Sequence, residues 1–142
     1  MMNNSEAFWE LRVALRKGQD SGLLPCETEA GRRFQMMVAE LAAPVLRELV
    51  MLLCMEGLTT HLIMGMDEAV PYVGIQLDTP ETTLWIYPST TSPEVFSRVQ
   101  GGLYPQYSSV RSFNYRTLTP SVLEPVIVEQ LRLVLCPPQP VI

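Results

Sequence analysis

A helical pattern over residues 29–56 dominates the distribution of apolar and polar positions, and its polar side disappears along its length. In its first part, charged residues recur at helical spacing on one stripe: Glu29, Arg33, Glu40 and Arg47. Residues 49–55 read Leu-Val-Met-Leu-Leu-Cys-Met and leave no polar side. Because such a helix has to be covered all round, the pattern predicts burial by the rest of the fold or by a partner chain.

The apolar end of this helix is the surface that we expect at a subunit or partner interface. The residues expected there are Leu49, Met51, Leu52, Leu53 and Met55. Six of the eight methionines fall within residues 36–66. Since methionine fills irregular cores and also adapts to binding partners, this enrichment fits a core, an interface or both.

The limits of the long helix follow from a few residues that start, bend or end helices. We expect Thr28 to cap its first turn and Gly57 to end it, because glycine readily adopts the left-handed conformation found after a last turn. Pro44 has no amide hydrogen to donate to the carbonyl of Glu40, which predicts a kink.

A shorter helix is predicted before the long one. Its apolar residues recur at helical spacing, and they are Phe8, Leu11 and Leu15. We expect Asn4 or Ser5 to cap this helix and Gly18 to end it. The turn-rich linker that follows allows the helix to fold back on its own domain or to exchange with a neighbouring chain.

Beyond Gly57 the period of the apolar positions falls to two, which predicts β-strands. The expected strands span residues 60–66, 72–77, 83–87, 95–100 and 110–116. The first three form a meander, with turns at 67–68 and 78–81. Residues 93–108 are open to two interpretations, because Pro93 could begin a short helix instead of preceding a strand.

A C-terminal helix is predicted from residue 121 onwards. Ser121 and Glu124 match a capping box, in which each side chain accepts a hydrogen bond from the other residue's free amide. The order of elements predicts an α+β fold, in which an antiparallel sheet of four or five strands packs on the long kinked helix and the C-terminal helix. We expect one domain over residues 1–142, made of an N-terminal helix and linker (1–27), a core (28–136) and a proline-rich tail (137–142).

Composition and charge narrow the class of protein. Hydrophobic residues make up 47% and charged residues 18% of the 142 residues, a surplus of apolar surface that suggests oligomerisation. Arg47, Glu48 and Glu56 interrupt the apolar stretch before it is long enough for a membrane span. The three scattered cysteines and the absence of a signal-peptide pattern predict a cytoplasmic protein.

The charges are unevenly distributed along the chain. Residues 62–97 contain no Lys, Arg or His, whereas residues 95–123 contain no acid. The acid-free stretch interleaves basic and aromatic residues that predict contact with nucleic acid or another anionic ligand: Arg98, Arg111, Arg116, Tyr107 and Tyr115. Two observations oppose this interpretation: the net charge of −5 disfavours general nucleic-acid affinity, and complementary charges on paired strands explain the same pattern.

The sequence contains little that indicates catalysis. The only histidine, His61, could act as a general base with Asp67 or Glu68 as its partner. The cysteines and His61 do not have the spacing of a zinc site, and no phosphate-loop or nucleophile motif occurs. We therefore expect no metal, no cofactor and no catalytic residue.

The function expected from these features is that of a non-enzymatic protein–protein interaction module, a small cytosolic adaptor or regulatory subunit. We expect it to be a homodimer through the apolar helix, with the sheet or the proline-rich tail offered to a larger protein partner. One alternative is a nucleic-acid or nucleotide-binding protein that uses the arginine and aromatic residues. A further alternative is a small enzyme that uses His61.

Overall fold

The structure is a computed structural model that describes residues 4–20 and 29–136. The chain divides into two units, residues 1–32 and 33–142. The expected caps, Asn4 or Ser5 of the first helix and Thr28 of the second, lie outside the residues whose side chains are described. Residues 21–28, which hold most of the predicted linker, and the predicted tail 137–142 lie outside the described residues as well.

In the first unit, α1 (Asn4–Asp20) forms the predicted N-terminal helix. It continues past Gly18, so the expectation that Gly18 ends it is wrong. An interior glycine costs a helix only about 1 kcal/mol, which the rest of the helix can offset. Several of its large apolar side chains are exposed, among them Phe8 and Trp9, and the Arg12 guanidinium lies 5.9 Å from the centre of the Trp9 ring.

The long helix consists of α2 (Glu29–Met37), a π-helical turn η1 (Val38–Ala42) and α3 (Ala43–Met55). The amide of Ala43 donates to the carbonyl of Val38, five residues back, which marks the widened turn. This turn directly precedes Pro44 in the first turn of α3, where a missing amide hydrogen does least damage. The predicted long kinked helix is confirmed, and the kink is associated with the π-helical turn.

The end of α3 is also as predicted. Gly57 has φ +89°, in the left-handed region. Its amide donates to the carbonyl of Cys54 at 3.0 Å, and the amide of Leu58 donates to Leu53 at 2.9 Å. These two hydrogen bonds are those of a Schellman motif, which satisfies the last carbonyls of the helix.

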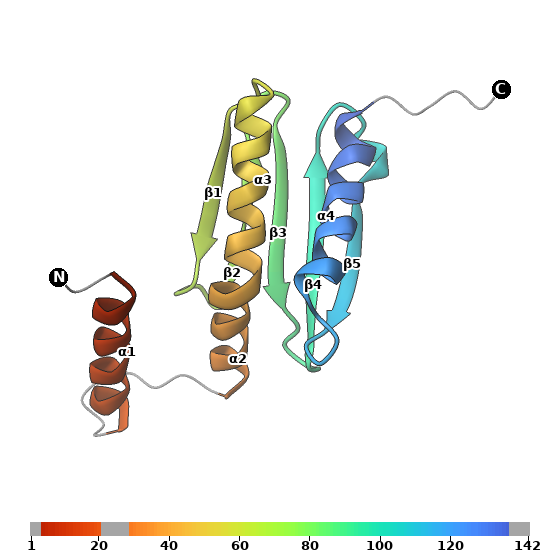
Figure 1. The fold of residues 1–142 in the computed structure, drawn as a ribbon. Coiled ribbons are helices and arrows are strands. Elements are labelled where there is room, and N and C mark those ends of the chain that lie inside the picture. The colour runs from red at the N-terminus through yellow and green to blue at the C-terminus, as the bar shows by residue number, and fades with distance from the viewer. Residues whose placement is uncertain (1–3, 21–28, 137–142) are drawn as a thin grey trace. The chain divides into compact units, whose positions relative to one another are not determined.

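Five strands form one antiparallel sheet in chain order, which confirms the α+β class (Figure 1). They are β1 (Thr60–Gly65), β2 (Tyr72–Leu77), β3 (Thr82–Pro88), β4 (Glu94–Gly101) and β5 (Ser109–Asn114). Within residues 93–108, the first part is thus strand β4, and a short 3-10 turn, η2 (Pro105–Tyr107), precedes β5.

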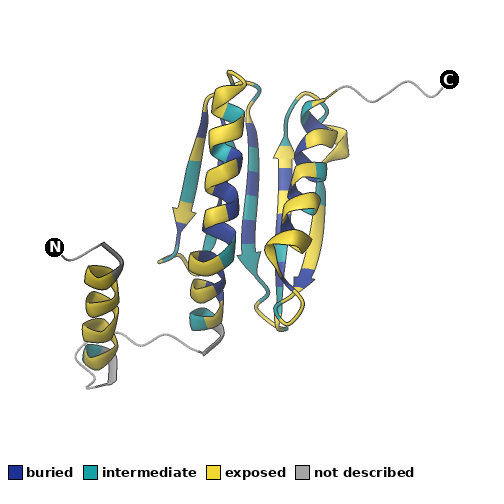
Figure 2. Cartoon of the chain, in the orientation of Figure 1, coloured by how far each residue is buried: buried dark blue, intermediate teal, exposed yellow. Residues whose placement is uncertain are grey.

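In the unit of residues 33–142, α3 and α4 (Pro120–Leu135) lie on the same face of the sheet (Figure 1). Helix α3 contacts β1 and β2, whereas α4 contacts β4. Buried residues follow the strands and the inner sides of both helices, and exposed residues mark the outer turns (Figure 2). The core between the layers includes Leu46, Ile75, Leu84 and Ile127, all with an exposed fraction of 0%.

Helix α4 begins with a different cap from the predicted one. The hydroxyl of Thr119 accepts a hydrogen bond from the amide of Val122 at 3.3 Å, so Thr119 is the N-cap. The expectation of a capping box at Ser121 is therefore wrong. Pro120 explains the shift, since proline fits the first position of a helix and leaves the cap to the residue before it.

A buried polar contact fixes α4 to the sheet. The Ser97 hydroxyl donates to Gln130 Oε1 at 2.7 Å, and Gln130 Nε2 donates to the carbonyl of Ser97 at 3.0 Å. The same nitrogen lies 3.3 Å from the carbonyl and from the hydroxyl of Ser109. Because buried polar groups are costly when unpaired, this contact aligns α4 with β4 and β5.

Candidate functional site

The exposed end of α3 carries large apolar side chains. We define the α3 surface as Met51, Leu52 and Met55, whose exposed fractions are 65%, 54% and 78%. Leu53 packs partly against the core, and Leu49 is a core residue with an exposed fraction of 9%. The structure therefore keeps three of the five residues predicted for an interface on one exposed surface and assigns Leu49 to the core.

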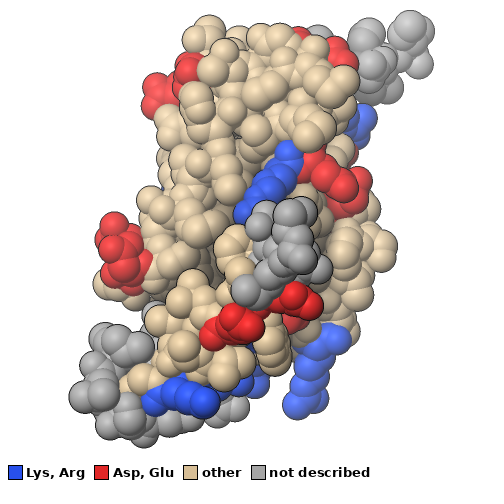
Figure 3. All heavy atoms as spheres, turned by 60° about the vertical axis from the view of Figure 1, so that its left-hand side comes forward, with Lys and Arg blue, Asp and Glu red and all other residues tan. Residues whose placement is uncertain are grey.

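Exposed acidic residues, Glu48 and Glu56, border the α3 surface. Figure 3 shows an area of uncharged side chains in its upper part, with acidic side chains at the edges of this area. A hollow of about 230 Å³ between α3 and α4 reaches Leu52, and Val128 lines its other wall. Glu48 and Glu124 also line this hollow. The α3 surface thus continues into an apolar groove with acidic side chains.

The opposite face of the sheet is aromatic, and within residues 33–136 no helix lies on it. Alternation along the strands places Tyr72, Trp85, Tyr87, Phe96 and Arg98 on this face, because their sequence neighbours are buried beneath the helices. We call these five residues the aromatic sheet face. The Tyr87 and Phe96 rings are register partners 5.6 Å apart, and the Arg98 guanidinium lies 5.9 Å from the Trp85 ring centre.

Glycines shape one edge of the aromatic sheet face. Gly65 pairs with Tyr72, and a Cβ at Gly65 would overlap the Tyr72 ring. The ring therefore packs over the glycine, an arrangement that stabilises glycine in strands. Gly74 is required for a different reason, because a Cβ there would overlap the backbone carbonyl of Leu84 on the neighbouring strand.

The residues predicted to contact an anionic ligand are not brought together. Arg98 belongs to the aromatic sheet face, whereas Arg111 pairs with buried Ser97 and so lies on the helix side of the edge strand β5. Tyr107 is in η2. Of these five predicted residues, only Tyr115 and Arg116 line the same hollow. Arg33 of α2, which belongs to the polar stripe predicted for the long helix, lines it with them.

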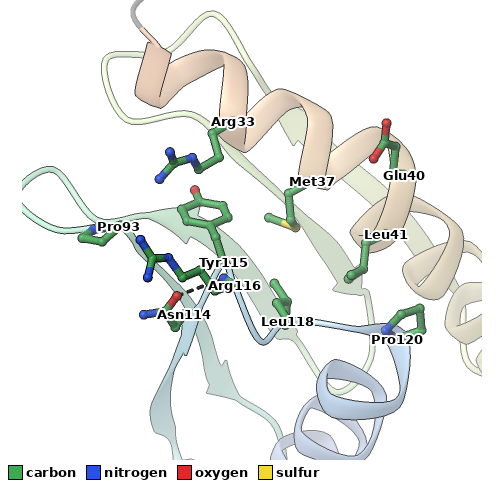
Figure 4. A pocket seen from close by; sticks show the side chains of 10 residues that line it. All are labelled: Arg33, Met37, Glu40, Leu41, Pro93, Asn114, Tyr115, Arg116, Leu118 and Pro120. Carbon is green, nitrogen blue, oxygen red and sulfur yellow. Dashed lines mark hydrogen bonds between the residues drawn. The ribbon is translucent and has the colours of Figure 1, made fainter.

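We call this hollow the Arg33 cleft, and it has a volume of about 940 Å³ (Figure 4). It lies between the segment spanning α2 and η1 and the connection from β5 to α4. Figure 4 shows the polar ends of Arg33, Tyr115 and Arg116 at one end of the cleft. Apolar side chains line much of the remainder, namely Met37, Leu41, Leu118 and Pro120.

Tyr115 is the most unusual residue of the cleft. Its hydroxyl oxygen is inaccessible to solvent and has no hydrogen-bond partner within the described part of the chain. Burial raises the pKa of the Tyr115 hydroxyl above 10.0, while the nearby positive charge of Arg33 acts in the opposite direction. The Arg33 guanidinium lies 5.7 Å from the centre of the tyrosine ring.

His61 has a different partner from the two predicted. Its Nε2 lies 3.3 Å from Asp78 Oδ2, and it has no such contact with Asp67 or Glu68. Both side chains are more than half exposed, which weakens the pairing through solvent screening. Within residues 4–20 and 29–136, no three His, Cys, Asp or Glu side chains are grouped as metal ligands.

Comparison with known proteins gives no relative. No family model, no curated protein and no solved structure matches this chain. None of the helices in the described residues combines the length and the apolar composition required to cross a membrane.

Proposed function

We propose that this protein is a non-enzymatic protein–protein interaction module, an adaptor or regulatory subunit that forms a homodimer through the α3 surface. The aromatic sheet face takes a larger protein partner. The observation that supports this proposal most is the exposure of apolar side chains at the end of α3, up to 78% at Met55. Large exposed apolar patches are characteristic of interaction sites.

The occupant proposed for the α3 surface is a second copy of the chain. Two copies related by a twofold axis bury the same patch on both chains, so the apolar side chains of Leu52 and Met55 in one copy meet apolar side chains of the same patch in the other. Methionine is flexible and fills the irregular gaps that such a contact leaves. Burial of this surface also provides the cover that the all-round apolar sequence of α3 requires.

The aromatic sheet face has the composition of an interface centre. Trp, Tyr and Arg are the residues most often found where an interface binds most strongly. The Arg98 guanidinium lies 5.9 Å from the centre of the Trp85 ring, within reach of a cation–π interaction, and we infer that it pairs with a carboxylate of the partner. We infer a partner segment that places apolar side chains over the aromatic rings and one acidic side chain near Arg98.

The proposed compartment is the cytoplasm. Both cysteines in the described residues, Cys54 and Cys136, are free and exposed. Exposed free thiols are compatible with a reducing compartment, where they do not form disulfides.

Affinity purification of the tagged full chain from its host, with nuclease present, tests the partner. We expect a stoichiometric protein that is retained by the wild type and by Leu103→Ser, a control at an exposed apolar residue outside both surfaces. Trp85→Ser should lose that protein while keeping its fold by circular dichroism. Equal retention by folded Trp85→Ser would contradict the role of the aromatic sheet face, and retention of nucleic acid alone without nuclease would favour the nucleic-acid alternative.

A further inference from the structure

The two arginines of the Arg33 cleft have no carboxylate partner among the residues described. The ion pairs His61–Asp78 and Arg132–Glu129 lie outside this cleft. The backbone amide of Arg116 donates to Asn114 Oδ1 at 2.9 Å, and within the described ranges its guanidinium makes no hydrogen bond or ion pair. Two guanidinium groups at one end of a hollow form a site of positive charge that favours an anion.

The tyrosine hydroxyl adds a hydrogen-bond donor to the same end. The hydroxyl is buried and has no hydrogen-bond partner among residues 4–20 and 29–136, and the exposed side chain of Arg33 lies beside it in Figure 4. If an anion draws the Arg33 guanidinium off the ring, the hydroxyl gains both access and an acceptor. Ligand binding would then satisfy a buried polar group that the described residues leave unpaired.

The rest of the cleft indicates what the anionic group is attached to. Met37, Leu41 and Leu118 give it apolar walls, and its volume of about 940 Å³ lies in the range of small-molecule sites. Glu40 lies toward the far end of the cleft from Arg33 in Figure 4, where its carboxylate disfavours a second anionic group. The arrangement therefore favours a ligand with one anionic head and an apolar body.

We propose that the Arg33 cleft binds a small organic anion, whose carboxylate or phosphate head is held by Arg33, Arg116 and the Tyr115 hydroxyl and whose apolar body lies on Met37, Leu41 and Leu118. This site lies apart from both surfaces of the proposed interaction module. The inference goes beyond the proposed function and does not depend on it.

Isothermal titration calorimetry of the full chain with phenyl phosphate, 4-phenylbutyrate and neutral 4-phenylbutanol tests the proposal. We expect at least one anion to bind about tenfold or more tightly than the alcohol, and the tighter anion identifies the head group. Arg33→Gln and Arg116→Gln should each lower the affinity for that anion about tenfold, as expected when a hydrogen bond to a charged group is lost. Arg111→Gln, which lies outside the cleft, should bind like the wild type.

Tyr115→Phe provides a variant that keeps the ring and removes only the hydroxyl. This variant should lower the affinity for the anion severalfold, and its thermal unfolding temperature should be equal to or higher than that of the wild type. Equal binding of the alcohol, equal weakening by Arg111→Gln, or no binding of either anion at about 10 mM would overturn the proposal. It would also be overturned if a single-stranded oligonucleotide bound through the same arginines far more tightly than phenyl phosphate, since the ligand would then be a nucleic acid.

Discussion

Helices α3 and α4 lie on the same face of one sheet, yet they present different outer surfaces. Helix α4 carries charged side chains outward, with Arg132 and Glu129 paired at 2.6 Å, and its most exposed large apolar residue has an exposed fraction of 44%. Helix α3 exposes Met51, Leu52 and Met55 at 54% to 78%. Large apolar side chains are therefore more exposed at the end of α3 than anywhere on α4.

The two helices also differ in how they are attached to the sheet. Helix α4 adds a buried hydrogen-bonded contact at Gln130 to its apolar packing. Helix α3 packs through buried apolar residues such as Val45, Leu46 and Leu49. Apolar packing is tolerant of sliding, whereas buried hydrogen bonds specify one position. We infer that the Gln130 contact holds α4 in a single alignment on the sheet.

Substitutions on the buried and the exposed side of α3 should differ most in their effect on the free energy of unfolding. Leu46→Ala removes a side chain with an exposed fraction of 0% and should lower the free energy of unfolding by about 2–5 kcal/mol. Leu52→Ala should cost less than about 1 kcal/mol at low protein concentration, because little of its burial occurs within one chain. Urea denaturation measures both, and equal losses would contradict the assignment of Leu52 to the surface.

The next effect concerns the attachment of α4. Ser97→Ala leaves Gln130 Oε1 without its buried donor and should lower the free energy of unfolding by about 1–3 kcal/mol. Ser112→Ala, at an exposed position on β5, should change it by less than about 0.5 kcal/mol. If the two variants unfolded at the same urea concentration, the buried contact would not fix α4.

The start of α4 gives a smaller effect. Thr119→Ala removes the cap of the helix and should cost about 1 kcal/mol. Ser121→Ala is the matched variant at the residue that sequence alone favours, and it should be nearly neutral. Thermal unfolding distinguishes them, and a larger loss for Ser121→Ala would reinstate the capping box.

The smallest change that we expect is in the pH dependence of folding stability, and it arises from Tyr115, the residue next to the Arg33 guanidinium. Because burial raises the pKa of Tyr115 in the fold, the unfolded chain ionises first as the pH rises past 10.0. The stability due to this residue is complete below that pH and declines above it. Tyr115→Phe should therefore lose less stability between pH 9 and about pH 11 than the wild type, and an identical decline would contradict the burial of the hydroxyl.

Much of this fold could be predicted from local signals in the sequence. The alternation of residues 72–77 coincides with β2, and Gly57 ends α3 as expected. The cap of α4 was harder to predict, because Ser121 fits a recognised pattern but Pro120 moves the start of the helix. Local sequence was sufficient to predict the structure at positions such as Gly57, where the conformational preference of one residue determines the outcome.

The surfaces could be predicted less well. An all-round apolar helix has no polar stripe to show which side is buried, so Leu49 could not be separated from Leu52. The Arg33 cleft unites Arg33 and Tyr115 from distant parts of the chain, and no local pattern reports such a contact. For the aromatic sheet face, alternation identifies residues on one face but does not tell which face the helices cover.

The most direct test of the central claim is the solution mass of the full chain by sedimentation velocity, for the wild type, Leu52→Asp and the control Leu103→Asp. We predict twice the 16.0 kDa of one chain for the wild type and the control, and 16.0 kDa for Leu52→Asp with an unchanged circular dichroism spectrum. A wild type that sediments as a monomer, or a Leu52→Asp variant that remains a dimer, would contradict the assignment of the α3 surface as the subunit interface.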